Sequence, residues 1–366
     1  MGGDHGCGVV VEGAVAALRE FGISSILVGD EAAITPHLQR LGLTGSSAIA
    51  VRHAPDVITM DDSPGKALRA KPQASIRVAL ELVSSGEACA VVSPGNTGAV
   101  MAASVFVSGL LPGIARPAIA SLIPRVGDLP PTVLLDSGAN IDCRADQLVQ
   151  FALMGSCYAA SLTSPRVPRI ALLSNGSEPS KGNDITRAAA LRLSRIPDLS
   201  FVGYVEGRDI PRDVADVVVC DGFVGNIVLK CMEGSVELVF DLIRRCAEMS
   251  LRGKIGMALA RPVLKRLFRE RLDPSAYGGA PLLGLNHVVI ICHGSARERA
   301  IMNGVRVARR FVEQGLGDQL RAALGRVESE AGGPWEDGMW DRLGDRFEKR
   351  PRLRAAGREV EKERKE

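Results

Sequence analysis

Aromatic residues, strong net charge and long apolar runs are all scarce in this sequence. Only 4% of the 366 residues are aromatic, which leaves little material for stacking on nucleic-acid bases. The net charge of +3 is too small to argue for or against a polyanion partner. No apolar run reaches the ~20 residues that a bilayer-spanning helix needs. We therefore expect a soluble protein that does not bind nucleic acid, although it could still lie on a membrane surface.

The eight cysteines form no motif. No two of them have the spacing of a zinc or redox pair, and we interpret them as isolated reduced thiols of a cytosolic protein. Cys220, directly before Asp221, is the one candidate thiolate nucleophile, but cysteine is also common in buried strands. G-x-S-x-G and H-E-x-x-H motifs are missing as well. We expect neither a metal nor an organic cofactor.

Short apolar runs, each about as long as a strand, recur along the chain. They cover residues 24–30, 48–54, 88–95, 118–124, 132–138, 169–176, 201–207, 216–222 and 287–294. Most are apolar without alternation, which indicates strands that are covered on both faces. Amphipathic stretches such as 75–86 and 147–162 lie between many of them. Strands that alternate with helices predict an α/β layered fold with a largely parallel sheet.

Most of these runs end in small polar or glycine-rich turns. The turns read VGD, SPGN, DSGAN, SNGS, CDGF and CHGS. In open α/β sheets the ligand crevice lies beyond the carboxyl ends of the strands. We therefore expect several of these turns to converge on one crevice that is rich in backbone N–H donors. Such a crevice suits an anion.

The turn within residues 93–103 leads from a strand into a helix of small residues. Gly95 and Gly98 permit a close backbone approach, and Asn96 or Thr97 could cap the helix. The amino terminus of a helix attracts phosphate through its free N–H groups and partial positive charge. The sequence is not a Walker motif, and an ordinary capped turn remains an equally open alternative.

Residues 216–230 repeat this arrangement, and a nearby loop adds a cation. Gly222 and Gly225 precede a helix that we predict to begin at Asn226. Lys181 lies beside a Gly-Asn pair in the loop 177–183, where its ammonium could reach phosphate oxygens. A lysine in such a loop is more commonly just solvated.

Two histidines occupy glycine-rich positions. His293 follows a predicted strand and precedes a Gly-Ser pair, and Asp4 and His5 stand among glycines at the start of the sequence. A single histidine is more often structural than catalytic, but this setting fits an anion site better than a core. His37 and His287 have no such setting, and we interpret them as structural.

Together these motifs resemble the bacterial phosphate acyltransferase family of phospholipid synthesis (PlsX). The resemblance extends from residue 1 to about residue 325 and follows the same order along the chain. It is carried by MGGDHG (1–6), HAPDVITMDDSPGKALRAK (53–71), SPGNTGAVMAA (93–103), DSGAN (136–140), SKGN (180–183), YVEGRDI (204–210), DVVVCDGFVGNIVLK (216–230), YGGAPLLGLN (277–286) and HGSA (293–296).

The resemblance implies both an activity and a fold. Family members transfer an acyl group from acyl carrier protein to inorganic phosphate, which yields acyl phosphate and the free carrier. The implied fold is a three-layer α/β/α sandwich, similar to isocitrate/isopropylmalate dehydrogenases and phosphotransacetylases. Its sheet is mixed, so some strands should run antiparallel. The resemblance also implies a homodimer, a cytoplasmic location on the inner face of the cell membrane, and a glycerol-3-phosphate acyltransferase that uses the acyl phosphate.

On this interpretation Lys181, Asn226 and His293 are the catalytic candidates. Phosphate, held by the turns and Lys181, would attack the thioester carbonyl directly, without a covalent enzyme intermediate. The candidate phosphate- and substrate-binding residues are Asp4, His5, Gly95, Asn96, Thr97, Gly98, Asn140, Asn183, Asp221, Gly222 and Gly225.

The sequence departs from the family pattern at two places. The strand that usually precedes the MGGD motif is not part of the sequence, and we expect this to weaken the pocket around Asp4 and His5. Ser177 stands where the family usually has a glutamate.

Two further segments depart from the α/β pattern. Residues 251–272 carry seven Lys or Arg and one acid among apolar residues, which suits docking on an acidic carrier or on a membrane. The predicted contacts are Leu259, Val263, Leu264, Leu267 and Phe268. A helical hairpin packed at a dimer interface is the alternative. Residues 326–366 are charged and poor in core residues, so we expect a flexible tail after a catalytic domain of residues 1–325.

Three other functions remain open. The same scaffold could carry a phosphotransacetylase that uses acyl-CoA, which carrier dependence would distinguish. A dehydrogenase is less favoured, because the sequence has no clustered metal-binding aspartates and no adenine-binding motif. The chain could also be a non-catalytic lipid- or carrier-binding regulator, which would bind phosphate and carrier without turnover.

Overall fold

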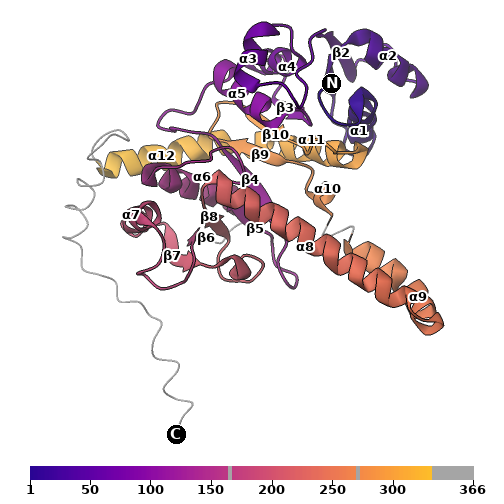
Figure 1. The fold of residues 1–366 in the computed structure, drawn as a ribbon. Coiled ribbons are helices and arrows are strands. Elements are labelled where there is room, and N and C mark those ends of the chain that lie inside the picture. Colours follow the sequence, from indigo (N-terminus) through magenta and orange to yellow (C-terminus); the bar gives the residue numbers. More distant parts are fainter. Residues whose placement is uncertain (164–166, 269–272, 332–366) are drawn as a thin grey trace.

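Eight strands form one mixed sheet at the centre of the molecule (Figure 1). The computed structural model describes residues 1–163, 167–268 and 273–331. In spatial order the strands are β3 (Ala90–Ser93), β10 (Val288–Ile291), β9 (Ala280–Leu283), β4 (Ala118–Ile123), β5 (Thr132–Leu135), β8 (Val217–Val219), β6 (Arg169–Leu173) and β7 (Ser200–Val205). Two further strands, β1 (Ser25–Gly29) and β2 (Ile49–His53), pair with each other in a separate parallel sheet.

Helices cover both faces of the main sheet. The α-helices of the described residues are α1 (Gly6–Phe21), α2 (Glu31–Arg40), α3 (Pro64–Ala70), α4 (Ser75–Ser84), α5 (Thr97–Val107), α6 (Ala145–Thr163), α7 (Asp184–Leu193), α8 (Gly222–Glu248), α9 (Leu251–Leu267), α10 (Pro274–Tyr277), α11 (Glu298–Glu313) and α12 (Leu316–Ala331). Side chains alternate across each strand, so β4 sends Ala118 and Ala120 into a core with α6 and α12. Ile119 and Ile123 face the other side, against α5 and α8 respectively. The result is the predicted α/β/α sandwich.

The strands of the main sheet run in two directions. β3 is parallel to β10, and β4 is antiparallel to both of its neighbours, β9 and β5. β9 is also antiparallel to β10, whereas β5, β8, β6 and β7 are mutually parallel. Hence β3, β10 and β4 run opposite to the other five strands. The mixed sheet implied by the resemblance is confirmed, and so is the largely parallel pairing predicted from the apolar runs, with antiparallel pairs only around β9 and β4.

Each predicted apolar run contains a strand, but two local predictions need correction. The helix predicted to begin at Asn226 begins at Gly222, because the carboxylate of Asp221 accepts a hydrogen bond from the Val224 N–H at 2.8 Å and caps the first turn. The sequence analysis also missed β9, whose second residue, Pro281, has no N–H group and is unusual inside a sheet.

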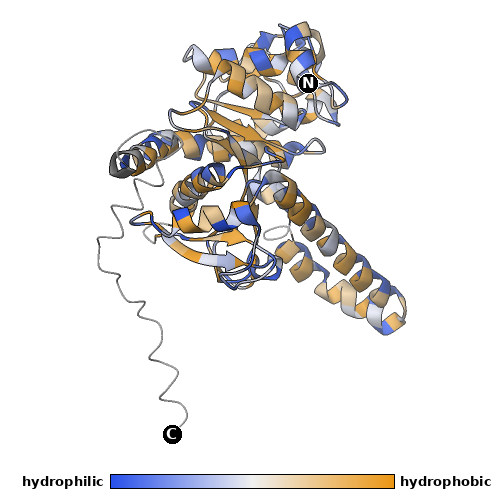
Figure 2. Cartoon of the chain, turned by 60° about the vertical axis from the view of Figure 1, so that its left-hand side comes forward, coloured by the Kyte–Doolittle hydropathy of each residue, from blue (hydrophilic) through white to orange (hydrophobic). Residues whose placement is uncertain are grey.

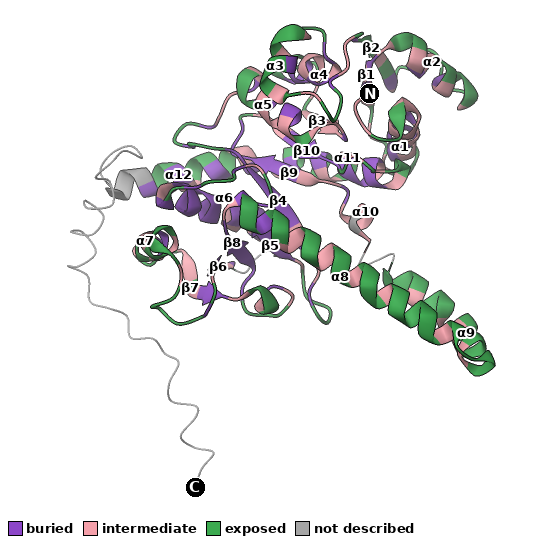
Figure 3. Ribbon diagram, viewed as in Figure 1, coloured by how far each residue is buried: buried purple, intermediate pink, exposed green. Residues whose placement is uncertain are grey.

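The helices α8 and α9 form a hairpin that projects from the sheet (Figure 1). Figure 3 shows that most of its residues are exposed, in contrast to the buried central strands. Figure 2 shows that apolar residues nevertheless recur along both helices. The Phe240 and Phe268 rings meet edge to face at 4.8 Å and hold α9 against α8. The side chain of Ser250 caps α9 by accepting a hydrogen bond from the Gly253 N–H.

The carboxyl-terminal helix α12 continues through residue 326, where the sequence predicted the tail to begin. Residues 332–366 of that tail and residues 269–272 of the basic segment lie outside the described residues. Within the described ranges, no helix is both long and apolar enough to cross a membrane.

Candidate functional site

Asp136 organises the turn that follows β5. Its buried carboxylate accepts hydrogen bonds from the backbone N–H groups of Ile119 (3.0 Å), Gly138 (3.2 Å), Ala139 (3.1 Å) and Asn140 (2.7 Å). The Asn140 side-chain amide donates another at 2.9 Å. Burial raises the pKa of Asp136, and these hydrogen bonds oppose that rise. The turn therefore folds around a single acidic side chain.

The first turns of α8 pack directly against this turn. The Gly222 N–H donates to the Asn140 carbonyl at 2.7 Å. Gly225 has to be glycine, because a Cβ there would overlap the Asp136 carbonyl oxygen. Asn226 directly follows Gly225, and its side chain lies beside Gly138. A Cβ placed on Gly138 would lie 3.8 Å from the Asn226 Cγ. Gly138 and Asn226 are both exposed. We call residues 136–140 and 220–226 the central turns.

Cys220 lies within the central turns but is not a suitable nucleophile. Its thiol is buried, and it contacts the Asp136 carbonyl oxygen at 3.6 Å. Burial, together with the carboxylates of Asp221 and Asp136, raises the pKa of Cys220 well above its ordinary value. The thiol is therefore protonated at neutral pH, which corrects the thiolate alternative left open by the sequence.

Lys181 lies at the same edge of the sheet as the central turns. Its loop follows β6, which is parallel to and paired with β8. The Lys181 N–H donates to the Glu178 carbonyl at 2.9 Å, and the side chain is exposed. Asn183 caps α7 reciprocally with Thr186, since each side chain accepts from the other residue's backbone N–H at 2.8 and 2.9 Å.

A second group of predicted residues gathers at the ends of β3 and β10, which run opposite to β5 and β8. The Asp4 N–H donates to the Gly294 carbonyl at 2.9 Å, and a Cβ on Gly3 would lie 3.3 Å from Pro94. Asn96 caps α5 by accepting from the Ala99 N–H at 3.0 Å, as the sequence suggested. We call residues 2–5, 93–98 and 293–295 the N-terminal turns.

The two histidines of the N-terminal turns differ in their contacts. The His293 Nδ1 lies 2.7 Å from the Ser295 hydroxyl and accepts from the Ser295 backbone N–H at 3.2 Å. The His5 residue precedes α1, and its side chain makes no capping hydrogen bond. Both side chains are exposed.

That the glycine-rich turns line one crevice stays a prediction. β3 and β10, which carry the N-terminal turns, run opposite to β5, β8 and β6. The strands are staggered, because Ile291 pairs with Ala280, Leu283 pairs with Ala118, and Leu135 pairs with Ala120. The carboxyl ends of β10 and β5 therefore lie at a similar height in the sheet and point in opposite directions. Asn140, Asp221, Gly222, Gly225 and Asn226 come together, and Lys181 and Asn183 follow the neighbouring strand. Asp4, His5, Gly95, Asn96, Thr97, Gly98 and His293 form the second group, at the ends of β3 and β10.

Asp136, which organises the central turns, is not among the predicted site residues. The motif DSGAN contributes only Asn140 to them, and not the acid that begins it. An acid directly after a buried strand and before a Ser-Gly pair was the available signal. Its partner Ile119 comes from another strand, which the sequence pattern does not pair with it.

The described residues contain no group of three or more His, Cys, Asp or Glu side chains that could hold a metal ion.

The predicted contact residues of α9 divide into two sets. Leu259, Val263 and Leu267 are exposed, whereas Leu264 is half-buried and Phe268 packs on Phe240.

Comparisons with known proteins extend over most of the chain. The family model described as "Fatty acid synthesis protein" matches residues 1–319. A phosphate acyltransferase of Syntrophotalea carbinolica is 48% identical over 330 residues, which cover 90% of this chain and 94% of the relative. The phosphate acyltransferase of Geobacter sulfurreducens is also 48% identical, over 87% of this chain and 91% of the relative.

Similar folds occur among solved structures. A phosphotransacetylase from Streptococcus pyogenes matches with a TM-score of 0.57 and 19% identity, covering 84% of this chain and 91% of the other. The EutD phosphotransacetylase of Staphylococcus aureus gives a TM-score of 0.51 at 16% identity, over 82% and 89% of the two chains. At these identities the likeness concerns the fold.

Proposed function

The chain belongs to the fatty acid synthesis protein family, and we propose that it transfers a fatty acyl group from acyl carrier protein to inorganic phosphate. The observation that carries this proposal is the 48% identity with a phosphate acyltransferase over 90% of the chain. The product, acyl phosphate, would supply an acyltransferase that acylates glycerol 3-phosphate in phospholipid synthesis.

The reaction needs no covalent enzyme intermediate. An oxygen of hydrogen phosphate attacks the thioester carbonyl carbon, so that a C–O bond forms and the C–S bond breaks. The phosphate proton passes to the departing sulfur, which leaves as the free thiol of the carrier. The ordinary thiol pKa of ~8.5 makes this a good leaving group. The protein has to position the reactants and stabilise the tetrahedral oxyanion.

We assign the thioester carbonyl to the central turns. The Asn226 side-chain amide can donate a hydrogen bond to the oxyanion, and the neighbouring Gly138 leaves room for a substrate atom. Both residues are exposed, which supports access from solvent. Removing one oxyanion donor typically lowers kcat about 10²- to 10³-fold, and this is the range we expect for Asn226→Ala.

Phosphate belongs on the Lys181 side of this edge. The carboxylates of Asp136 and Asp221 already occupy the central turns and would repel a dianion placed against them. The exposed Lys181 ammonium provides the opposite charge. Asn183 remains a candidate contact there.

An exposed apolar surface at the central turns is suited to hold the acyl chain. Ile141, Phe223 and Ile227 are large apolar side chains that are more than half exposed. Phe223 belongs to the central turns, and Ile141 and Ile227 directly follow them in the sequence. The Asn140–Gly222 hydrogen bond brings Ile141 next to the start of α8. We propose that the acyl chain lies over these side chains.

We also propose binding roles for the N-terminal turns and for α9. The N-terminal turns, with Asp4, His5, Gly95, Asn96 and His293, would bind part of the carrier-linked substrate at the amino terminus of α5, which covers the same face of the sheet as α8. The basic α9 would dock the acidic carrier or an anionic membrane. A homodimer at the inner face of the cell membrane is consistent with these roles.

A coupled assay tests the proposed reaction. The chain is incubated with inorganic phosphate and an acylated carrier protein, and the acyl phosphate is trapped with hydroxylamine while free carrier thiol is counted. We expect equal amounts of both products, dependent on phosphate. Equal rates with acyl-CoA in place of the acylated carrier would favour a phosphotransacetylase. Binding of carrier and phosphate without either product would favour a regulator.

A further inference from the structure

We propose that Asp136 is a positioning residue for the acyl-transfer step and acts through Asn226. The inference rests on the proposed function, because Asn226 is assigned there as the oxyanion donor. Asp136 itself is buried and lies where no substrate atom can touch its carboxylate. Its role is to fix the distance between the exposed Gly138 and the exposed Asn226 side chain.

Asp136 connects the two halves of the central turns through both its side chain and its backbone. The carboxylate accepts hydrogen bonds from four backbone N–H groups and one side-chain amide. Four of these five donors belong to residues 138–140. The backbone N–H of Asp136 donates to the Cys220 carbonyl at 3.0 Å, which ties the turn to the end of β8. The whole turn thus depends on this side chain for its shape.

The contact with α8 leaves almost no space for adjustment. A Cβ on Gly222 would lie 2.7 Å from the Asp136 Oδ2 and 2.8 Å from the Asn140 nitrogen. A Cβ on Gly225 would come closer still and would overlap the Asp136 carbonyl oxygen. Because both glycines touch the turn, any movement of the turn moves the first turns of α8, and Asn226 moves with them.

Asparagine at position 136 would keep the size of the side chain but not its acceptors. One carboxylate oxygen accepts from Ile119, Gly138 and Ala139, and the other accepts from Ala139 and twice from Asn140. In Asp136→Asn one of these oxygens becomes an NH₂ group that faces N–H donors. The turn must open on that side, because two donors cannot share a hydrogen bond.

A double-mutant cycle tests the inference. We would measure kcat and the phosphate KM for Asp136→Asn, Asn226→Ala and the double variant. We expect each single variant to lose about 10²-fold in kcat, with the phosphate KM within about twofold of the parent. The double variant should be no slower than the worse single variant, because both changes remove the same interaction.

The control is Asp216→Asn, which changes a buried carboxylate at the opposite end of the parallel strands. Asp216 precedes β8, whereas Asp136 follows β5, and these two strands are parallel. Asp216→Asn should lower the melting temperature. At assay temperatures below the melting temperature of this variant, its kcat should equal that of the parent. If Asp136→Asn does not fold, Asn140→Ala takes its place, because it keeps the carboxylate and removes one of its donors. Asn140→Ala should lose less kcat, and its effect should be non-additive with that of Asn226→Ala in the same way.

The outcomes separate this inference from the proposed function. If Asn226→Ala leaves kcat unchanged, the assigned reaction centre is wrong. If Asn226→Ala is slow but the losses multiply in the double variant, the centre stands and the positioning role of Asp136 is overturned. A loss of kcat in Asp216→Asn equal to that in Asp136→Asn would also overturn it, because stability alone would then explain both.

Discussion

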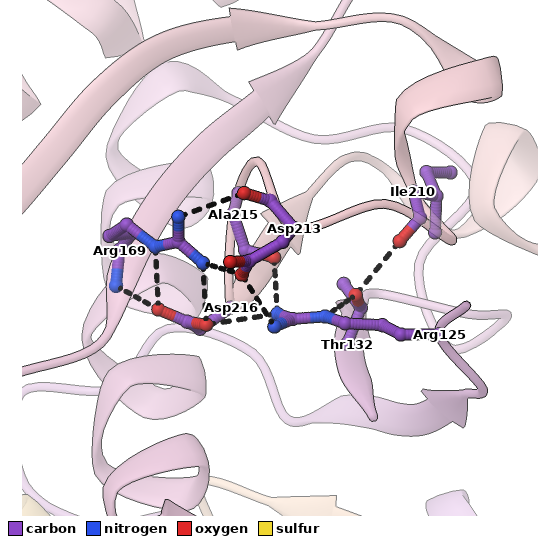
Figure 4. A network of polar contacts seen from close by, with 7 residues as sticks. All are labelled: Arg125, Thr132, Arg169, Ile210, Asp213, Ala215 and Asp216. Atoms are coloured by element: carbon purple, nitrogen blue, oxygen red, sulfur yellow. Dashed lines mark hydrogen bonds and ion pairs between the residues drawn. The ribbon is translucent and has the colours of Figure 1, made fainter. Parts of the chain in front are cut away.

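Arg125 and Asp216 form a buried ion pair, with 3.0 Å between the guanidinium and the carboxylate and side-chain exposures of only 2% and 10% (Figure 4). Arg125 also donates to the Thr132 hydroxyl at 2.7 Å, and Thr132 donates to the Ile210 carbonyl at 2.8 Å. Arg169 also pairs with Asp216, at 3.1 Å, and Asp213 pairs with both arginines, so that two carboxylates balance two guanidinium groups. This network joins the loop after β4 to the starts of β5, β8 and β6, at the edge opposite the central turns.

Removing Arg125 should destabilise the protein strongly. Arg125→Ala leaves the buried Asp216 with one cation instead of two and the Thr132 hydroxyl without its donor. Breaking a buried pair in this way typically costs about 3–5 kcal/mol. The matched control is Arg244→Ala, whose partner Glu248 forms an exposed pair worth about 1 kcal/mol or less. Urea unfolding measures both, and equal losses would contradict the assigned importance of burial.

The network should also make stability depend on pH in the acid range. Burial alone would raise the pKa of Asp216, but hydrogen bonds from Arg169 and Arg125 outweigh it and lower the pKa to about 2. Because the unfolded pKa is near 3.9, the stabilisation is complete above about pH 4 and is lost as the pH falls toward 2. Unfolding free energies of Asp216→Asn should be flatter over this range. A parent-like slope would assign the acid sensitivity to other carboxylates.

Lys181→Ala should raise the phosphate KM or lower turnover at least about tenfold, because it removes the cation proposed to face the phosphate. Lys265→Ala removes an equally exposed lysine from the distant α9 and should leave the phosphate KM unchanged. Initial rates at varied phosphate measure both. If the two variants behave alike, Lys181 does not belong to the phosphate site.

Two glycines of α8 should respond in opposite directions to alanine. In Gly225→Ala the new Cβ meets the Asp136 carbonyl oxygen, so either the helix or the turn must move and the melting temperature should fall. In Gly234→Ala the Cβ meets nothing within 4 Å, and the gain in helix propensity should stabilise the protein by up to about 1 kcal/mol. Thermal unfolding of the two variants tests this. A destabilised Gly234→Ala would point to a contact on that face of α8.

The exposed apolar side chains of α9 should contribute to binding at anionic membranes. Leu259 and Val263 are 77% and 70% exposed and stand one helical turn apart among basic residues. Changing both to Glu should reduce flotation with vesicles that contain anionic lipid, whereas Leu191→Glu on α7 should not. Undiminished flotation of the α9 variant would exclude the segment as a membrane contact. Phe268 is unsuitable for this test because it packs on Phe240.

Much of the local structure followed from the sequence. Apolar runs located the strands, and Asn96 was correctly predicted as a candidate cap for the helix that is α5. These features depend on neighbours within a few residues, which a sequence pattern displays. The capping role of Asp221 was overlooked, although its signal, an acid before a glycine, was visible in the same way.

The grouping of the turns was decided only by the tertiary structure. Strand position can be read from local hydrophobicity, but strand direction depends on which edges pair, and β4 pairs antiparallel on both sides. Because of that reversal β10, which precedes His293, and β6, which precedes Lys181, run in opposite directions. It also brings Ile119 to the carboxylate of Asp136 across neighbouring strands. Hydrogen bonds between residues far apart in the chain have no local signature. The sequence by itself thus determined which turns could bind a ligand, and the pairing of the strands determined which of them act together.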